Sequence, residues 1–260
     1  MKKKKRYIVI LVVLVVYALI MLIVMGKDLL IPSKNTATLI IGDTSVWKLK
    51  EDSWTNLTMR SSIEELNWQE YKVYLDNKEY GNYYLWQNGD KWYIFDKDKK
   101  AVAREGNLLA IQSNYEMKVK NFTTKDIRNY HHVNKVLEEN NLSTSSKLTV
   151  ATETSIDIDN DGQNETFYFV SNAFSLDYNP SQVFSLVFMV KNSKVYPMYT
   201  DIAPNYSTNG CKPYLSAVLD INQDNLYEMV ISCGKYSTDK PADMLYHLTE
   251  EGFKIIISNQ

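Results

Sequence analysis

A short acidic loop pattern occurs twice in the second half of the chain. Both copies have oxygen-bearing side chains at loop positions one, three, five and nine, and a residue at position seven that can offer its backbone carbonyl. The first copy supplies Asp157, Asp159, Asp161, Gln163 and Glu165, and the second supplies Asp220, Asn222, Asp224, Leu226 and Glu228. Calcium takes about six to eight oxygen ligands, which a tightly turning loop presents from alternate residues. The spacing therefore predicts a pair of Ca²⁺ sites.

The sixth position of each loop needs a sharp turn with positive φ. Gly162 tolerates that conformation best, and Asn225 holds the same position in the second copy. The first loop carries four carboxylates, whereas the second carries three and one amide. We therefore expect the first loop to bind calcium more tightly and the second to bind weakly or not at all.

Two other interpretations of the loops compete with this one. An EF-hand requires a bidentate Glu at position twelve, where the two copies have Tyr168 and Ile231. Polar hairpin turns are also rich in Asp and Asn without binding a metal. The repetition of the pattern, with Ile158 and Ile221 at the same position, favours the calcium interpretation.

The two loops lie in matching surroundings. β-branched and aromatic runs flank each loop, at residues 147–154, 166–171, 183–190 and 195–199 in the first copy and 213–219, 227–232, 244–248 and 253–258 in the second. Each unit is predicted to run strand, acidic loop, strand, strand, tight turn, strand. Repeated four-stranded units are typical of propeller-like or stacked-sheet arrays.

These motifs resemble the FG-GAP or VCBS-type repeats of integrin α-subunit propellers and bacterial surface proteins. The family loop reads D-h-D-x-D-G-x-x-D/E, which the first copy matches at every fixed position, while Asn222 and Asn225 depart from it in the second. The resemblance covers about residues 147–258 and implies a calcium-braced β-scaffold, not a reaction. The chain is too short for about seven blades of ~40–45 residues, so a complete propeller of that type is not expected.

The N-terminus predicts the compartment. A basic tail (residues 1–6) precedes an uncharged apolar run (7–26) that is long enough to span a bilayer as a helix. A cleaved signal peptide or a buried core helix would be the alternatives, but the run is long for a signal core and has no convincing cleavage site. We expect a retained signal anchor in the plasma membrane, with the basic tail cytoplasmic and the rest of the chain extracytoplasmic.

The rest of the chain divides by composition. The segments are a tether (27–36), a tryptophan-rich β segment (37–120), a connecting helix (121–145) and the two loop-bearing repeats (146–260). All five tryptophans lie in the β segment, which forms either degenerate blades or a separate small β-domain. The helix is expected at about residues 125–139, with Thr123 and Asp126 as a capping box. The predicted fold class is therefore mostly β, with one transmembrane helix, an antiparallel β-repeat ectodomain and one connecting helix.

Cys211 and Cys233 flank the second acidic loop. A disulfide between them would clamp the hairpin, and oxidation is possible outside the membrane. A register that pairs Asp220 with Glu228 places Cys233 opposite Leu215 and not opposite Cys211. A bulge could correct this offset, so the pattern leaves both outcomes open.

Three functions fit these features. The first is a membrane-anchored, calcium-stabilised binding or scaffold protein that engages another cell-envelope component. The second is a cell-wall or carbohydrate-binding protein that uses the aromatic residues between Trp47 and Trp92, and the third is an envelope glycan hydrolase with paired carboxylates. The chain has no nucleophile elbow, zinc signature or phosphate loop. The net charge is −2 and five basic residues lie in the N-terminal tail, so the rest of the chain is acidic, which disfavours nucleic acid as a partner.

Overall fold

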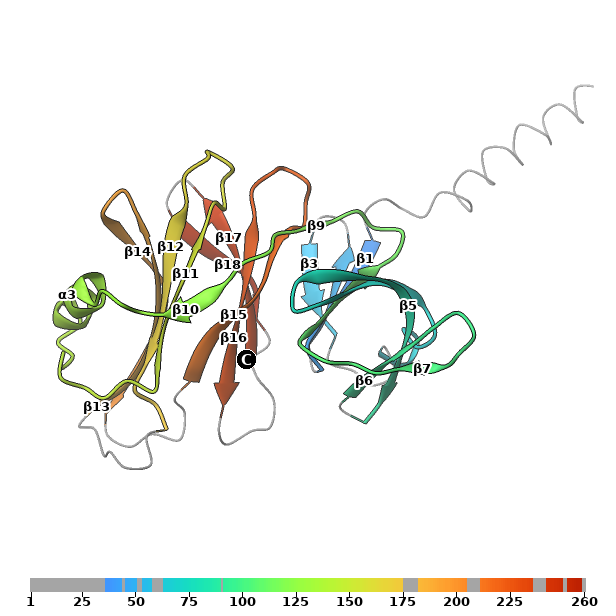
Figure 1. The fold of residues 1–260 in the computed structure, drawn as a ribbon, viewed down its shortest axis with the longest axis horizontal. Coiled ribbons are helices and arrows are strands. Elements are labelled where there is room, and N and C mark those ends of the chain that lie inside the picture. Colours follow the sequence, from blue (N-terminus) through green and yellow to red (C-terminus); the bar gives the residue numbers. More distant parts are fainter. Residues whose placement is uncertain are drawn as a thin grey trace, which may run out of the picture.

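The computed structural model describes residues 36–43, 45–50, 53–57, 63–89, 91–174, 182–204, 211–235, 242–249 and 252–258. These residues form three antiparallel sheets and the helix α3 (Figure 1), which confirms the mostly β fold class. The predicted span at 7–26 and most of the tether lie outside these residues. Within the part of the chain that is described, no helix has the length and apolarity needed to cross a membrane.

The tryptophan-rich segment forms its own sheet of eight strands, which we call the N-terminal sheet. Its strand order is β3-β2-β1-β8-β4-β5-β6-β7. The strands are β1 (Thr36–Ile41), β2 (Ser45–Lys50), β3 (Ser53–Asn56), β4 (Glu70–Leu75), β5 (Lys78–Asn88), β6 (Lys91–Phe95), β7 (Ala101–Val102) and β8 (Leu108–Gln112). The end of this segment, β9 (Lys118–Val119), pairs instead with β15 (Cys211–Asp220) of the second repeat.

The predicted repeats are both present as four-stranded meanders. The first-repeat sheet contains β10 (Thr124–Asp126), β11 (Val150–Ile156), β12 (Glu165–Ser171), β13 (Gln182–Lys191) and β14 (Lys194–Pro204). The second-repeat sheet contains β9 (Lys118–Val119), β15 (Cys211–Asp220), β16 (Glu228–Lys235), β17 (Ala242–Thr249) and β18 (Gly252–Ser258). Each acidic loop joins the first two strands of its meander, as predicted.

The three sheets stack, with the second-repeat sheet in the middle (Figure 1). Leu219, Val230 and Leu245 of this sheet pack against Leu39 and Trp47 of the N-terminal sheet. Its opposite face packs against the first-repeat sheet, whose outer face is covered by α3. Strands buried on both faces have continuous apolar runs, and such runs are what β12, β13 and β16 show. The described strands stack as open sheets and do not close into a propeller.

The connecting helix is shorter than predicted. The helix α3 spans His131–Glu139. Its N-cap residue is Tyr130, which makes no side-chain capping hydrogen bond. The capping box expected at Thr123 and Asp126 is wrong, because Thr124–Asp126 is extended and pairs with β11. Sheet pairing satisfies backbone groups of this segment that a capping box would otherwise have served. An apolar stripe of Ile127, Tyr130, Val133, Val136 and Leu137 was expected, and all of these residues except the exposed Tyr130 are buried.

Candidate metal centre

Each acidic loop turns as its sequence predicted. Gly162 has φ +84° and Asn225 has φ +66°, so the sixth position is left-handed in both copies. The fourth position, Asn160 or Gln223, also has positive φ. Two left-handed residues in one short loop bring its alternate side chains toward a common side.

A buried glutamate holds each loop closed. Glu165 is 1% exposed, and its Oε2 accepts a hydrogen bond from the amide of Ile158 at 3.1 Å. Glu228 is also 1% exposed and accepts from the amide of Ile221 at 3.0 Å. The ninth position of each loop is thus joined to the second position in the same way.

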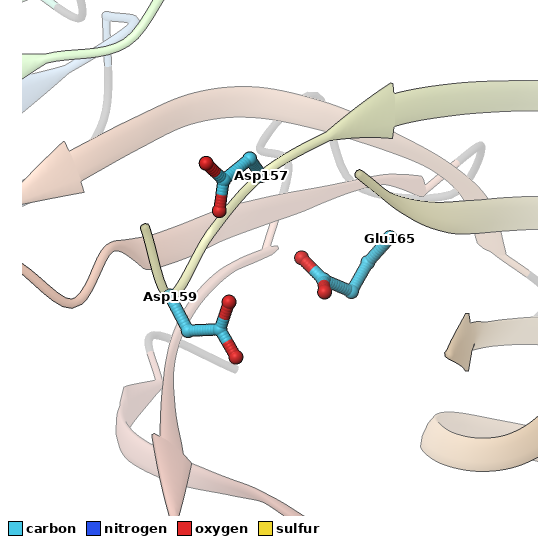
Figure 2. Close-up of side chains that lie close together, drawn as sticks. All are labelled: Asp157, Asp159 and Glu165. Atoms are coloured by element: carbon cyan, nitrogen blue, oxygen red, sulfur yellow. The ribbon is translucent and has the colours of Figure 1, made fainter. Parts of the chain in front are cut away.

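Three carboxylates of the first loop converge on one point (Figure 2). Oxygens of Asp157, Asp159 and Glu165 all lie within 4.8 Å of one another. Asp157 Oδ1 and Asp159 Oδ1 are buried and accept no hydrogen bond, and Glu165 Oε1, which is also buried, has the ammonium of Lys191 beside it at 2.9 Å. A buried carboxylate oxygen without a hydrogen bond is costly unless a cation balances it. The donor set of oxygens fits a hard divalent cation.

Lys191, at the end of β13, reaches into this cluster. Its Nζ lies 2.5 Å from Asp159 Oδ2 and 2.9 Å from both Asp161 Oδ2 and Glu165 Oε1. Burial alone would lower the pKa of Lys191, but its hydrogen bonds to the three carboxylates outweigh burial and raise it. The hydrogen bond from Lys191 also lowers the pKa of Asp161, helped by the amide of Gln163.

The second loop does not gather its carboxylates in the same way. Asp220 is fully buried and neither of its oxygens accepts a hydrogen bond, although Lys118 Nζ lies 3.5 Å from Oδ2. Asp224 accepts two hydrogen bonds from its own loop, one from Asn222 Nδ2 at 2.9 Å and one from the Leu226 amide at 2.8 Å. Within the described residues, only the first loop forms a cluster of three potential metal-ligating side chains.

The seventh position adds a turn to each loop. The amides of Gln163 and Leu226 donate to Asp161 Oδ1 at 2.7 Å and to Asp224 Oδ1 at 2.8 Å. These hydrogen bonds hold the side chains of Asp161 and Asp224, at the fifth position, against the backbone of their own loops. That the carbonyls of Gln163 and Leu226 serve a metal stays a prediction.

The two loops lie against each other, which sequence reasoning did not foresee. The amide of Tyr227 donates to the carbonyl of Ile158 at 2.8 Å. Asn160 Nδ2 donates to the carbonyl of Asn225 at 2.6 Å. Lys120 adds to this contact, because its Nζ bonds the Asp157 carbonyl and lies 4.5 Å from the centroid of the Tyr227 ring. The loops therefore form one paired structure at the edge of two sheets.

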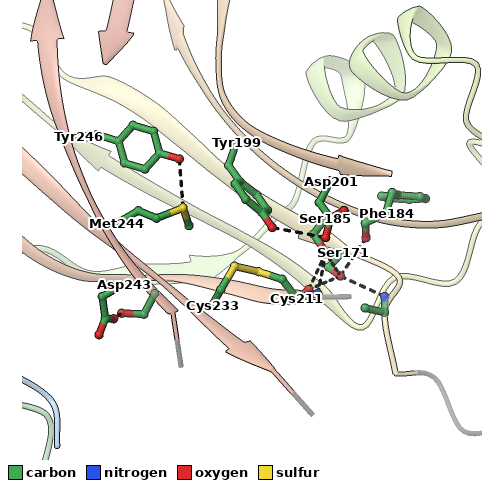
Figure 3. Close-up of a disulfide and its surroundings, with 12 residues drawn as sticks. Ser171, Phe184, Ser185, Tyr199, Asp201, Cys211, Cys233, Asp243, Met244 and Tyr246 are labelled. Carbon is green, nitrogen blue, oxygen red and sulfur yellow. Dashed lines mark hydrogen bonds between the residues drawn. A yellow bond between two sulfur atoms is a disulfide. The ribbon is translucent and has the colours of Figure 1, made fainter. Parts of the chain in front are cut away.

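A disulfide closes the opposite end of the second hairpin (Figure 3). Cys211 and Cys233 are bonded, with their Cα atoms 5.2 Å apart. The register of β15 and β16 differs by one residue from the expected one near the acidic loop. A bulge between Leu215 and Ala217 then shifts this register by one further residue. Cys233 consequently lies opposite Pro213 and within reach of Cys211.

Comparisons with protein families, with curated proteins and with solved structures find no match to this chain. The resemblance to calcium-loop repeats therefore stays a prediction from short motifs.

Proposed function

We propose that the protein is a membrane-anchored, extracytoplasmic β-scaffold whose first acidic loop binds Ca²⁺, and that its surface engages another component of the cell envelope. The metal part of this proposal rests on the convergence of Asp157, Asp159 and Glu165, in which buried oxygens of Asp157 and Asp159 accept no hydrogen bond. The anchor and the compartment rest on the basic tail and the apolar run at 7–26.

The chemistry of the loop favours calcium over other divalent cations. Its side-chain donors are oxygens only, whereas zinc sites in proteins are rich in His and Cys. Magnesium requires near-ideal octahedral geometry and keeps several waters, which a flexible loop of this kind does not impose. The oxygens belong to a loop that tolerates adjustment, and such sites suit calcium at the millimolar levels found outside cells.

Calcium at the first loop would stabilise the scaffold and would carry out no chemistry. The loop contacts the second loop through the Ile158 carbonyl and the Asn160 side chain. A cation held there would brace the edge at which the two repeat sheets meet. The expected effect of calcium is therefore on stability.

The first test is thermal unfolding of the full-length chain, purified in detergent, in EDTA and in millimolar calcium. A ligand at 100 times its dissociation constant that binds only the folded state adds about 2.7 kcal/mol to the free energy of unfolding. A rise of several degrees in Tm with calcium, and a smaller rise with magnesium, is expected. An unchanged Tm would overturn the metal site.

Two reciprocal variants assign the effect to a loop. Asp159→Asn gives the first loop the third-position amide that the second loop has, and should abolish the rise. Asn222→Asp gives the second loop the missing third-position carboxylate, and should increase the number of calcium ions bound. If Asp159→Asn kept the full rise, the first loop would not be the site.

A second candidate function, glycan binding, is favoured by an exposed aromatic cluster on the N-terminal sheet. Trp68 and Tyr93 are each 42% exposed. The rings of Trp68 and Trp86 stack with centroids 6.4 Å apart and planes 23° apart, and the Tyr93 ring lies 6.0 Å from Trp86. Flat, exposed aromatic faces of this kind can stack on sugar rings.

Polar groups lie beside this aromatic cluster. A hollow of about 510 Å³ is lined by Tyr93 together with Lys91, Asp43 and Arg104, and the last two form an ion pair. Such groups can hydrogen-bond to hydroxyls of a sugar next to a stacked ring. The hollow would therefore give a glycan both apolar and polar contacts.

Sedimentation with purified cell-wall polysaccharide tests this second candidate. The double variant Trp68→Ala, Trp86→Ala should lose binding, while Tyr80→Ala, which removes an exposed aromatic elsewhere on β5, should keep it. Equal sedimentation of all three proteins would exclude the cluster as a glycan site.

The third function considered, a glycan hydrolase, gains no support. Burial raises the pKa of Asp243, a carboxylate outside the acidic loops, although hydrogen bonds from Ser232 and Ser45 oppose this. The cavity beside it measures only about 30 Å³. That volume suits a single water and is too small for a sugar.

A further inference from the structure

The two repeats carry a basic side chain at the same structural position. In the first repeat, Thr166 pairs with Val190, so the next residues, Glu165 and Lys191, lie opposite each other. In the second, Met229 pairs with Tyr246, which places Glu228 opposite His247. The strand register therefore sets a basic residue beside the ninth-position glutamate of each acidic loop.

Both basic side chains contact that glutamate directly. Lys191 Nζ lies 2.9 Å from Glu165 Oε1, and His247 Nδ1 lies 2.8 Å from Glu228 Oε1. In each glutamate the other oxygen accepts the amide of the loop's second residue. The basic residue thus contacts the glutamate oxygen that the loop amide does not bond.

Lys191 stands where a divalent cation would have to lie. Its ammonium is within 2.9 Å of oxygens from Asp159, Asp161 and Glu165, and two of these belong to the convergent triad. Calcium binds carboxylate oxygens at about 2.3–2.6 Å. Lys191 and the proposed cation share Glu165 Oε1 and the Asp159 carboxylate, so the ammonium at this position and a calcium ion bound to these two groups would lie too close together.

Lys191 is also able to leave. It is the last residue of β13, next to the turn that leads to β14, and its side chain is 23% exposed. A lysine has a flexible four-carbon stem, so its ammonium can move into solvent while the backbone stays paired. The carboxylate cluster would then be free for a cation of higher charge.

We propose that Lys191 is a built-in counter-cation that competes with the divalent cation for the first acidic loop. This proposal rests on the metal site proposed above and adds its regulation. Without calcium, Lys191 offsets part of the negative charge of the loop and keeps it folded. Calcium displaces Lys191, so the lysine lowers the apparent affinity of the site and sets the calcium concentration at which it fills.

Calcium titration of the full-length chain and of Lys191→Met tests the competition. The variant keeps an unbranched side chain and removes the charge. Its calcium affinity should rise about fivefold or more, since the variant removes a competing unit charge at contact distance. Lys194→Met is the matched control, because Lys194 is exposed and its ammonium lies over the Tyr196 ring, away from the loop.

Thermal unfolding gives a readout that a purely structural role would not produce. In EDTA, Lys191→Met should melt below wild type, because the carboxylates then repel one another without a cation. In millimolar calcium the variant should match or exceed wild type. A lysine that only supported the fold would lower the Tm in both conditions.

Each outcome of the titration has a definite meaning. If wild type and Lys191→Met bind calcium equally, the competition is wrong and the metal site stands. If only Lys191→Met binds, the competition is supported and calcium bracing of the wild-type protein is overturned. If neither binds, both proposals fail.

Discussion

At the scale of single residues, buried carboxylates determine how the protein responds to ions and protons. Glu165 and Glu228 have basic partners, whereas the hydrogen bonds described for Asp243 come from two neutral serines. Asp243 is 2% exposed and accepts hydrogen bonds from Ser45 of the N-terminal sheet and Ser232 of its own sheet. A carboxylate of this kind is more costly to ionise in the fold than in water.

Asp243 should make stability depend on pH. Burial raises its pKa above the ordinary 3.8, with the two serine hydrogen bonds opposing the shift. A raised pKa means that the folded state binds the proton more tightly than the unfolded state does. The stability that this proton contributes is fully present below the ordinary pKa and is lost as pH rises through the pKa of the folded state. As pH rises from about 4 to about 7, the free energy of unfolding of Asp243→Asn should therefore fall less than that of wild type.

Chemical unfolding across this pH range measures the effect. Asp98→Asn, a change at an exposed turn residue, is the control and should follow wild type. Parallel pH profiles for wild type and Asp243→Asn would show that burial of this carboxylate has no consequence.

At the scale of elements, the hairpin of β15 and β16 depends on both of its ends. The acidic loop closes one end and the disulfide closes the other. Ser171 and Ser185 of the first-repeat sheet both donate to the Cys211 carbonyl, at 2.8 and 2.6 Å (Figure 3). The disulfide therefore lies where the two repeat sheets are joined by hydrogen bonds.

Removing the disulfide should destabilise the protein substantially. The bridged cysteines are 22 residues apart, and a loop of that size restricts the unfolded chain by about 3 kcal/mol in the chain-entropy description. The double variant Cys211→Ser, Cys233→Ser should lose stability of this order in urea unfolding. Wild type treated with a reductant should show the same loss. Unchanged unfolding of the reduced protein would contradict this expectation.

At the scale of the whole molecule, the second-repeat sheet joins the other two. Its faces contribute to two separate cores, one with the N-terminal sheet and one with the first-repeat sheet. Such sharing favours cooperative unfolding, because neither neighbour keeps its buried face once the middle sheet is lost.

Leu245→Ala tests this coupling. Leu245 is fully buried between the second-repeat and N-terminal sheets, and truncating such a residue typically costs about 2–5 kcal/mol. All five tryptophans belong to the N-terminal segment, so their fluorescence reports on that unit and, through Trp47, on its contact with the second-repeat sheet. The fluorescence and circular-dichroism transitions should move together to lower temperature. A circular-dichroism shift without a fluorescence shift would show that the units unfold independently.

The sequence by itself determined the features that depend on neighbours along the chain. The alternation of strands and turns, the position of both acidic loops and the left-handed backbone at Gly162 and Asn225 were all predicted. Each follows from local conformational preference, which a residue expresses with little regard to distant partners.

The tertiary structure decided the features that depend on strand pairing. Local pattern favoured a helix that begins at about residue 125, but pairing with β11 made Thr124–Asp126 a strand. Register placed Lys191 beside Glu165 and, through one bulge, brought Cys233 to Cys211. The stacking of the two repeats set the loops against each other. A shift of one residue in any of these pairings would turn different side chains into the site, and spacing along the chain does not contain that information.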